Sequence, residues 1–360
     1  MKTIKIMQIV PSFEVGGAET MCAGLCKALA GMGHSVVAVS LASIPTQITR
    51  QLMDAGVEVR FLDKKPGMDL GCVGRLRALI RREGPQVLHT HLHALKYAAL
   101  AFTGVPVIHT IHNQAEQEAV SLDQKIGRFL FRRGKALPVA LSPRIRDSIV
   151  RLYGLPEGQV PVVLNGIDLS RCQAKTDYSL HDPVELIHVG RFYPQKNHEA
   201  ILEALVLLNQ RGISARVRLF GEGPRLEEIR EKAAALGVDS QVHFEGVTDN
   251  VFAPMSQSDL FVLPSKWEGI PMTVIEAMGT GLPVIAAQVG GLTDMVSSGY
   301  SGMLIAPTGA ALAQAVETLV KDPQLRETLG KNGLQKAQSF RVEEMARRYE
   351  KLYRQEGGSL

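Results

Sequence analysis

The sequence has few of the residues that mark secreted or membrane-spanning proteins. Its 360 residues include only four cysteines, Cys22, Cys26, Cys72 and Cys172, and a single tryptophan. Because no secretory context supports disulfides, we interpret the cysteines as buried thiols in a reducing compartment. No apolar run reaches the ~18 residues that a transmembrane helix needs. The apolar start, MKTIKIMQIVPSF, fits a first strand better than a signal peptide.

The sequence also lacks repeats, low-complexity segments and the C-x-x-C pairs of structural zinc sites. At roughly 100–200 residues per domain, its length favours two globular domains. The net charge of +4 is unevenly distributed, because residues 1–165 hold 20 Lys and Arg against 12 Asp and Glu. Residues 166–360 hold 20 Lys and Arg against 24 Asp and Glu. The basic first half therefore suggests an anionic partner or surface.

Short apolar runs alternate with helical segments along the chain, which is typical of an α/β protein with parallel sheets. Strands are predicted at 4–13, 35–41, 57–62, 87–92, 105–111, 138–142, 160–164, 184–189, 216–220, 242–244, 260–263, 283–286 and 303–305. The polar stretch at 170–183 suits a linker, after which the pattern starts again. We therefore predict two doubly wound parallel-sheet domains, 1–168 and 169–340, facing each other across a cleft. A last helix within 341–360 stands apart from this pattern.

The stretch at 259–291 places two carboxylates beside a helix start. A buried strand is followed by a loop that carries Glu268, and a helix begins near Thr273 and carries Glu276. Ligands of parallel sheets bind at the carboxyl ends of the strands, where a helix N-terminus suits a phosphate. Since carboxylates repel phosphate, we expect Glu268 and Glu276 to accept hydrogen bonds from ribose or sugar hydroxyls. A capping box with Thr273 is the alternative for Glu276, and the two roles are compatible.

Two cations follow another strand end. Arg191 comes directly after Gly190, and Lys196 lies five residues later, before a helix. A fork-shaped donor and a point charge at a strand end suit a diphosphate, with ordinary surface charge as the alternative. Near the N-terminus, Gly16 and Gly17 connect a strand to a helix. They form either a tight turn or a floor on which a phosphate or sugar approaches the backbone.

Histidines gather near two strand ends of the first half. His89, His91 and His93 alternate along one predicted strand, which places them on one face, and His109 and His112 follow at the next strand. The alternation raises a metal site as an alternative. Because no cysteine or carboxylate lies nearby in sequence to complete it, we expect no metal. We expect at least one of these histidines to meet a ligand, and we interpret His89, His93 and His109 as hydrogen-bonded structural residues.

The segment 125–135 combines cations with apolar residues. Its cations are Lys125, Arg128, Arg132, Arg133 and Lys135, and they surround Ile126, Phe129, Leu130 and Phe131. A basic amphipathic helix of this kind can lie on an anionic membrane surface. An ordinary solvated helix face is the alternative, and the sequence leaves both open.

With these residues assembled, the chain resembles the large retaining glycosyltransferase family 4, also called glycosyl transferases group 1. The matching segments run nearly end to end and are GGAE at 16–19, VLNGID at 163–168, VGRFYPQKN at 189–197, FGEGP at 220–224 and PSKWEGIPMTVIEAM at 264–278. The last of these is the most specific. The resemblance implies the GT-B architecture, in which two Rossmann-like domains face each other, and a last helix that crosses back to the first domain.

The resemblance also implies roles for individual residues. Arg191 and Lys196 would bind the donor diphosphate and stabilise its charge as the glycosidic bond breaks. Glu276 would accept hydrogen bonds from the ribose, and Glu268 and His112 would contact the transferred sugar. The implied catalytic residues are thus Arg191, Lys196, Glu268 and His112, and the implied donor-binding residues are Gly16, Gly17, Gly190, Arg191, Lys196, Gly221, Glu268, Gly269, Ile270, Pro271, Met272, Thr273, Val274 and Glu276.

The family transfers hexoses with retention of configuration and usually without a metal, and this sequence has no D-x-D pair. Retention by double displacement needs a carboxylate nucleophile. Because Glu268 is implied to hold the sugar, the resemblance favours front-face substitution, in which the leaving phosphate takes the acceptor's proton. We expect no cofactor and a nucleotide-sugar donor, most often a UDP-sugar such as UDP-N-acetylglucosamine or UDP-glucose, although GDP-mannose enzymes share these motifs.

We expect a glycan or lipid-linked acceptor in polysaccharide or cell-envelope synthesis, and no nucleic-acid partner. The expected location is cytoplasmic, with contact between 125–135 and the inner face of the membrane. One alternative is an epimerase of UDP-N-acetylglucosamine with the same architecture, which needs acid and base groups at the sugar's C2. The other is a non-catalytic nucleotide-sugar-binding subunit, which would be expected to have lost Arg191, Lys196 or Glu268.

Overall fold

The computed structural model describes residues 2–14, 16–118, 121–248 and 250–357. The chain divides into two compact units, one of Met1–Ile167 with Arg341–Leu360 and one of Asp168–Phe340. They are called unit 1 and unit 2 below, and each is described by itself. The boundaries predicted from the sequence, after residues 168 and 340, lie at or next to these divisions.

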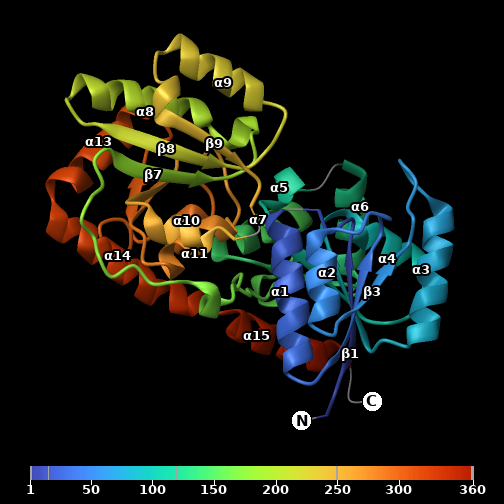
Figure 1. The fold of residues 1–360 in the computed structure, drawn as a ribbon. Helices are drawn as coiled ribbons and strands as arrows, with labels where there is room; N and C mark the ends of the chain where they lie inside the picture. Colours follow the sequence, from blue (N-terminus) through green and yellow to red (C-terminus); the bar gives the residue numbers. More distant parts are fainter. Residues whose placement is uncertain (1, 15, 119–120, 249, 358–360) are drawn as a thin grey trace. The chain divides into compact units, whose positions relative to one another are not determined.

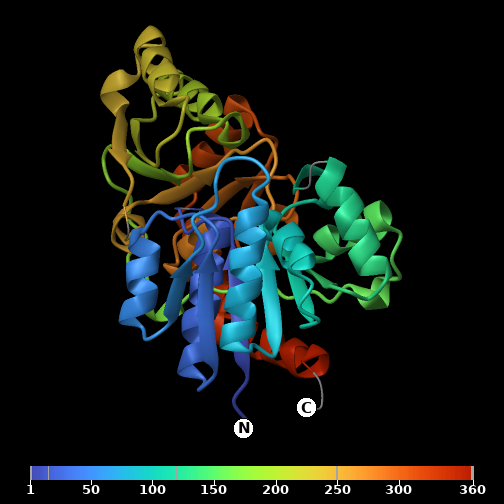
Figure 2. The ribbon, with the colours of Figure 1, turned by 90° about the vertical axis from the view of Figure 1, so that its right-hand side faces the viewer.

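A six-stranded parallel sheet forms the centre of unit 1 (Figures 1 and 2). Its strands are β1 (Lys5–Val10), β2 (Ser35–Ser40), β3 (Glu58–Phe61), β4 (Val87–His91), β5 (Val107–Ile111) and β6 (Leu137–Ala140), in the order β3-β2-β1-β4-β5-β6. The helices are α1 (Gly17–Gly31), α2 (Gln47–Asp54), α3 (Leu70–Glu83), α4 (Leu95–Ala101), α5 (Ala115–Glu118), α6 (Ser121–Arg132), α7 (Pro143–Tyr153) and α15 (Val342–Glu356). Because helices cover both faces, the valine- and isoleucine-rich strands are buried almost throughout.

The last helix, α15, belongs to unit 1 although all of unit 2 precedes it in sequence. The chain re-enters beside Ile167, whose carbonyl oxygen accepts a hydrogen bond from the Val342 amide at 2.9 Å. A Cβ atom at Gly166 would lie 2.7 Å from the Val342 Cα, so the close approach requires glycine. α15 then packs on α1, and its Tyr349 and Tyr353 side chains are completely buried.

Unit 2 contains a second six-stranded parallel sheet, in the order β12-β11-β10-β7-β8-β9. Its strands are β7 (Val184–Val189), β8 (Ala215–Phe220), β9 (Val242–Gly246), β10 (Leu260–Leu263), β11 (Val284–Ala287) and β12 (Met303–Ile305). Its helices are α8 (His198–Gln210), α9 (Leu226–Ala235), α10 (Phe252–Gln257), α11 (Met272–Gly279), α12 (Leu292–Met295), α13 (Gly309–Lys321) and α14 (Pro323–Ala337). The apolar faces of α8 and α13 meet over the sheet and form one core with Leu186, Val262 and Ile285.

Both sheets have the same doubly wound topology, as the strand–helix alternation predicted. The strand order reverses between β1 and β4 in unit 1 and between β7 and β10 in unit 2. In such sheets the loops that leave the two central strands on either side of the reversal bound a crevice for ligands. The reversal point therefore defines, in each unit, where a functional site is expected.

Some local predictions were wrong. Residues 160–164 form only an isolated bridge between Ala140 and Val162, next to Pro161, which has no N–H to donate to a ladder. Helices α2, α4 and α14 were missed. Gly330 and Gly333 weaken the helical sequence pattern of α14. The structure shows why glycine is needed at position 330, because a Cβ atom there would overlap a neighbouring tyrosine ring and a backbone carbonyl.

Candidate functional site

The loops after β7 and β10 meet through an ion pair at the reversal point of the unit 2 sheet. The Nζ atom of Lys196 lies 2.6 Å from Oε1 of Glu268. Glu268 keeps only 5% of its side chain exposed and Lys196 keeps 15%. Gln195 strengthens the contact, because its side-chain amide donates to Oε2 of Glu268 at 3.2 Å and to the Trp267 carbonyl at 2.9 Å. The sequence predicted Lys196 and Glu268 as site residues but did not predict Gln195.

Glycines hold the loop after β7 against the loop after β8. The Gly190 backbone is close to the aliphatic part of Lys196, since a Cβ atom there would lie 3.2 Å from its Cδ. Gly221 has a φ of +136°, and a Cβ atom at this position would overlap the Gly190 carbonyl oxygen. A side chain at Gly221 would therefore displace the backbone from which Lys196 and Arg191 project.

A second pair of glycines fixes the Glu268 loop. Gly290 has a φ of +50°, and a Cβ atom on it would overlap the Glu268 carbonyl oxygen. The Gly291 amide donates to the same carbonyl at 3.2 Å. Sequence reasoning missed this pair, although two consecutive glycines after a buried strand are a signal for close backbone approach. The two glycines therefore allow the backbone after β11 to pack directly against the backbone of the Glu268 loop.

The helix after the Glu268 loop, α11, starts at Met272 and has no side-chain cap. The predicted capping box is therefore wrong, because Pro271 is the N-cap and Thr273 already lies inside the helix. The Thr273 hydroxyl is buried without a hydrogen-bond partner among the described residues. An uncapped helix start leaves amides available to an anion, and the hydroxyl adds a further donor beside them.

Glu276 is half-buried on α11, one turn beyond Thr273. Burial raises the pKa of Glu276 to about 7, and the Arg171 guanidinium partly opposes this rise. The Cys172 thiol lies close enough that burial and the Glu276 charge together raise the pKa of Cys172 to about 12. Glu276 thus changes charge near neutral pH, so its ionisation can be coupled to ligand binding.

Arg191, the second predicted cation, is exposed and lies over the Tyr193 ring, with 5.2 Å between its guanidinium carbon and the ring centroid. No ion pair of Arg191 is found within the described ranges. The structure therefore places Arg191 on the same loop as Lys196 without bringing it into the Lys196–Glu268 contact. A stacked, unpaired guanidinium keeps its donors available to an anion.

The loop residues predicted in unit 1 lie around its own sheet reversal. Gly16 and Gly17 follow β1 and start α1, with Gly16 as an extended N-cap that has no side-chain bond. His112 is half-buried directly after β5, and its Nε2 lies 3.0 Å from Nδ1 of His91. The Glu118 carboxylate accepts hydrogen bonds from the backbone amides of His112 and its neighbour Asn113. Sequence reasoning did not find the role of Glu118.

The other histidines have the hydrogen-bonded roles that the sequence predicted. His89 is fully buried and bonded on both ring nitrogens, His109 contacts Thr90, and His93 pairs with Asp123 at the surface. One detail was wrong, because β4 ends at His91 and His93 lies in the following 3₁₀ turn (Leu92–Ala94). In the described part of the chain, no group of three or more His, Cys, Asp or Glu side chains is arranged to hold a metal ion.

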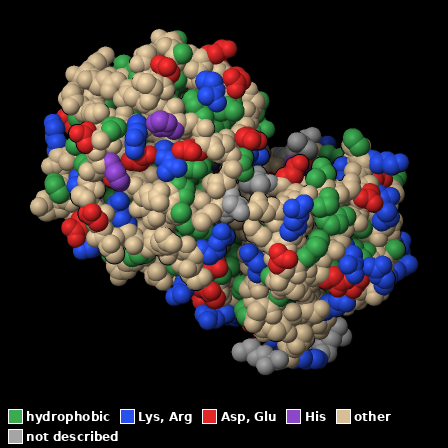
Figure 3. Space-filling model, in the orientation of Figure 1, with side chains coloured by type: hydrophobic (Ala, Val, Ile, Leu, Met, Phe, Trp, Pro, Cys, Tyr) green, Lys and Arg blue, Asp and Glu red, His purple; other side chains and the backbone are tan. Residues whose placement is uncertain are grey.

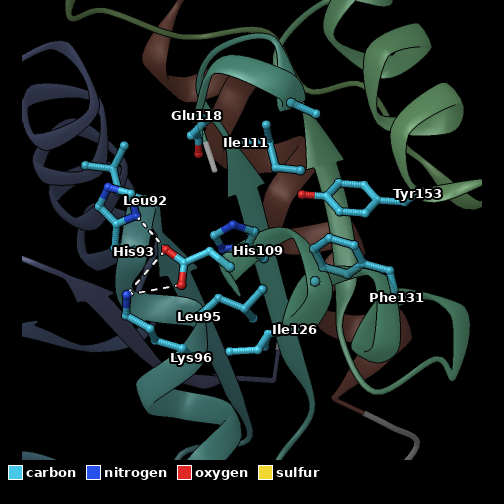
Figure 4. A pocket seen from close by; sticks show the side chains of 13 residues that line it. Leu92, His93, Leu95, Lys96, His109, Ile111, Glu118, Ile126, Phe131 and Tyr153 are labelled. Carbon is cyan, nitrogen blue, oxygen red and sulfur yellow. Dashed lines mark hydrogen bonds and ion pairs between the residues drawn. The ribbon is translucent and has the colours of Figure 1, made fainter. Parts of the chain in front are cut away.

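A small cavity of about 30 Å³ lies beside His109 and Ile111, with room for one or two water molecules (Figure 4). Glu118, His109 and Tyr153 point into it, and Phe131 stacks on the His109 ring. Burial raises the pKa of Glu118 to about 8, so this carboxyl is mostly protonated at neutral pH. The cavity is too small for a sugar, and the Glu118 side chain that lines it also accepts the His112 and Asn113 amides.

The predicted basic segment forms α6 and the turn after it. Leu122 and Phe129 are 61% and 59% exposed, and their spacing of seven residues puts them on one helix face. Arg128 and Arg132 donate to carbonyl oxygens at the end of α7, while Arg133 lies over the Phe129 ring. On the face seen in Figure 3, basic and acidic side chains are interspersed on both units. No helix among the described residues is long and apolar enough to cross a membrane.

Comparisons with known proteins identify the family and the fold. Residues 15–171 match glycosyltransferase family 4, and residues 175–336 match glycosyl transferases group 1. N-acetyl-alpha-D-glucosaminyl L-malate synthase of Bacillus anthracis is 24% identical over 94% of each chain. Glycogen synthase of Mycobacterium tuberculosis is 27% identical over 90% of this chain and 87% of its own. The solved structure of Anabaena HepE with UDP and glucose has a TM-score of 0.85 at 21% identity, covering 97% of this chain and 99% of that one, which shows a common fold.

Proposed function

Since the chain belongs to the group 1 glycosyltransferases of family 4 and has their GT-B fold, we propose that it transfers a sugar from a UDP-sugar to a glycan or lipid-linked acceptor. UDP-N-acetylglucosamine and UDP-glucose are the preferred candidates. The first is suggested by the name of the Bacillus anthracis relative, and the second by the UDP and glucose bound to HepE. The location proposed is cytoplasmic, in polysaccharide or cell-envelope synthesis.

The observation that carries the proposal is the Lys196–Glu268 pair at the sheet reversal of unit 2. A diphosphate at this point would meet the Lys196 ammonium, the open donors of Arg191 and the uncapped start of α11. The Gly190 and Gly221 backbone and the loop from Gly269 to Val274 would surround it. Glu276, lying inward along α11, would accept hydrogen bonds from the ribose hydroxyls.

Glu268 would hold the transferred sugar, and the family resemblance assigns His112, Gly16 and Gly17 to the same sugar. In the proposed step, the bond between the anomeric carbon and the phosphate oxygen breaks, and the acceptor oxygen attaches to the same face of the sugar. The acceptor's proton passes to the departing phosphate, so the products are a glycoside and UDP. Lys196 and Arg191 would stabilise the charge that develops on the leaving group.

We propose that Glu268 is not a covalent nucleophile. Its carboxylate is engaged by Lys196 at 2.6 Å and by Gln195 at 3.2 Å, which lowers its reactivity toward carbon. We also propose that the reaction needs neither a metal nor a cofactor, because the two cations supply the charge that a divalent ion would provide. Activity that is unchanged by excess EDTA would support this part.

A panel of radiolabelled nucleotide-sugars tests the proposal. Transfer to an added acceptor, or slow hydrolysis of one donor, is expected with the wild-type chain and not with a Lys196→Met variant. Binding of a donor without any turnover would contradict the proposal and favour a non-catalytic subunit. Conversion of UDP-N-acetylglucosamine to its C2 epimer would instead indicate an epimerase.

A further inference from the structure

Seven side chains in the core of unit 1 form an unbroken hydrogen-bonded chain from α15 to His112. The chain runs from His112 to His91 (3.0 Å), Gln8 (2.9 Å), Tyr353 (3.0 Å), His89 (2.7 Å), Thr110 (2.7 Å) and Tyr349 (2.7 Å). Every member except His112 is completely buried. Two of the members, Tyr349 and Tyr353, lie on α15, so the helix that returns to unit 1 is linked to the predicted site residue His112 through Gln8 and His91.

The histidines of this chain are neutral at physiological pH. Burial lowers the pKa of His89 and His91 well below the usual value, and it lowers the pKa of His112 to about 3. A neutral imidazole carries a proton on one ring nitrogen and a lone pair on the other. When both ring nitrogens are hydrogen-bonded, one must donate and the other must accept. The role of one nitrogen therefore fixes the role of the other.

The orientation of the Gln8 side-chain amide determines which ring nitrogen of His91 carries the proton. Its side-chain Nε2 donates to the Tyr353 hydroxyl, so its Oε1 faces His91 and accepts from the His91 Nε2–H. The Cys22 thiol also points at this oxygen, at 4.0 Å, as a weak donor. With Nε2 protonated, His91 has only a lone pair on Nδ1, which must accept from the Nε2–H of His112. His112 is left with an unprotonated Nδ1.

We infer that the Gln8–His91 pair is a positioning device that holds His112 in the Nε2–H tautomer, with Nδ1 as a hydrogen-bond acceptor for a hydroxyl of the transferred sugar. The inference rests on the proposed function for the identity of the ligand, but the tautomer itself follows from unit 1 alone. No hydrogen bond of the His112 Nδ1 is found among the described residues, and His112 is half-exposed.

The tautomer has a consequence for donor choice. A lone pair accepts a proton but offers none, so the site would require a donor sugar with a hydroxyl at the matching position. A deoxy sugar leaves Nδ1 without a partner, and a deoxyfluoro sugar does the same because fluorine cannot donate. The expected loss in kcat/KM is roughly 10- to 100-fold for both analogues at that one position. A protonated Nδ1 would instead tolerate fluorine better than hydrogen.

Nitrogen-15 NMR of the histidine-labelled full chain reads the tautomer directly, with the His112 signals assigned from a His112→Gln variant. The expected result is a protonated Nε2 and a bare Nδ1. A protonated Nδ1 in the wild-type protein would overturn the inference, because it would mean that Gln8 presents its amide nitrogen to His91. This measurement needs no activity, so its failure is distinct from a failure to find any transfer.

Three variants test whether Gln8 is responsible. Gln8→Leu removes the acceptor for His91 and should give a mixture of His112 tautomers and a 10- to 100-fold loss of kcat/KM. Gln8→Glu keeps an acceptor facing His91 and should retain the single tautomer at a pH where His91 stays neutral. Tyr349→Phe is the matched control, because it removes a hydroxyl at the far end of the same chain and should leave His112 unchanged. A folded Gln8→Leu variant with the wild-type tautomer would overturn the role of Gln8.

Discussion

The ammonium of Lys196 lies 2.6 Å from the carboxylate of Glu268, and the two residues follow strands β7 and β10 on opposite sides of the sheet reversal in unit 2. A nearly buried carboxylate is costly unless a cation neutralises it, and Lys196 does so here. In the proposed reaction the same ammonium also meets the diphosphate. Glu268 stays engaged and uses its remaining lone pairs to accept hydrogen bonds from the sugar hydroxyls.

Replacing Lys196 by methionine is predicted to lower kcat on the order of 10²–10³-fold, because a preorganised cation is lost where negative charge develops. The variant keeps the aliphatic chain that packs near Gly190. It also leaves the Glu268 charge unpaired, which should reduce the free energy of unfolding by about 3–5 kcal/mol. Steady-state kinetics and urea denaturation measure the two effects.

Combining Lys196→Met with Glu268→Gln separates catalysis from stability. With both charges removed, the free energy of unfolding should return most of the way to the wild-type value, while kcat stays low. Lys266→Met provides the matched control, since Lys266 is an exposed cation in the loop that carries Glu268. This variant should change neither kcat nor the free energy of unfolding. Wild-type turnover in the single Lys196→Met variant would contradict the role assigned to this residue.

Gly221→Ala is predicted to weaken both the fold and donor binding. Its φ of +136° is unfavourable for alanine, and the new methyl group would overlap the Gly190 carbonyl oxygen. We expect a loss of more than about 2 kcal/mol in the free energy of unfolding, together with a raised KM for the donor. Gly237→Ala is the control, because Gly237 has a φ of +67° but open space around it, and the cost there should be about 1 kcal/mol. Equal effects in both variants would show that the close approach to Gly190 has no influence.

The two cations and the glutamates could be proposed from the sequence because each follows a strand in a parallel α/β pattern, where ligands bind. The contact between Lys196 and Glu268 could not be predicted in this way. Lys196 and Glu268 are 72 positions apart in sequence, and they meet only because β7 and β10 are neighbours across the reversal. The same holds for His91, whose partner Gln8 is 83 positions away. Local patterns predict elements and their ends, whereas such pairs depend on the order of strands.

The capping box at Thr273 and Glu276 failed for a related reason. The spacing fits a capping box with Thr273 as the N-cap, but the N-cap is Pro271, two residues earlier, and the helix begins at Met272. A sequence pattern does not fix a helix start to within one or two residues when both proline and threonine suit the position. The two-residue shift matters, because it leaves the Thr273 hydroxyl and the Glu276 carboxylate without capping roles.

Donor binding is predicted to depend on pH through Glu276. The pKa of Glu276 is about 7, above its ordinary value, so the carboxyl is largely protonated at pH 6. Ribose hydroxyls donate more strongly to the ionised form, so binding should favour ionisation and release protons near pH 6. UDP-glucose affinity should therefore rise as the pH increases from about 6 to about 7.5. Isothermal titration calorimetry in two buffers with different ionisation enthalpies measures the protons released.

The matching control for Glu276 is Glu276→Gln, which has no proton to lose. It should bind UDP-glucose more weakly at pH 7.5, with no proton release and a flat pH dependence. The effect of rising pH on the free energy of unfolding is opposite in sign to its effect on donor affinity. Because burial raises the pKa, the ionised carboxyl disfavours the folded state, so the free energy of unfolding should fall from about pH 4.5 to about pH 7. Proton uptake on donor binding would contradict the assignment of Glu276 to the ribose.

Membrane binding through α6 is the last prediction. Leu122 and Phe129 are exposed on one face of a helix that also carries Lys125 and is followed by Arg133, so both apolar insertion and charge attraction are expected on anionic lipid. The double variant Leu122→Ser with Phe129→Ser should reduce sedimentation with phosphatidylcholine–phosphatidylglycerol vesicles by about tenfold or more, since each buried apolar side chain contributes about 1.5–3 kcal/mol when fully inserted. Phe102→Ser is the control, because Phe102 is 74% exposed in unit 1 but lies outside α6. Equal binding of the wild-type chain to neutral and anionic vesicles would count against contact with an anionic membrane and favour an ordinary solvated helix face, the alternative that its sequence left open.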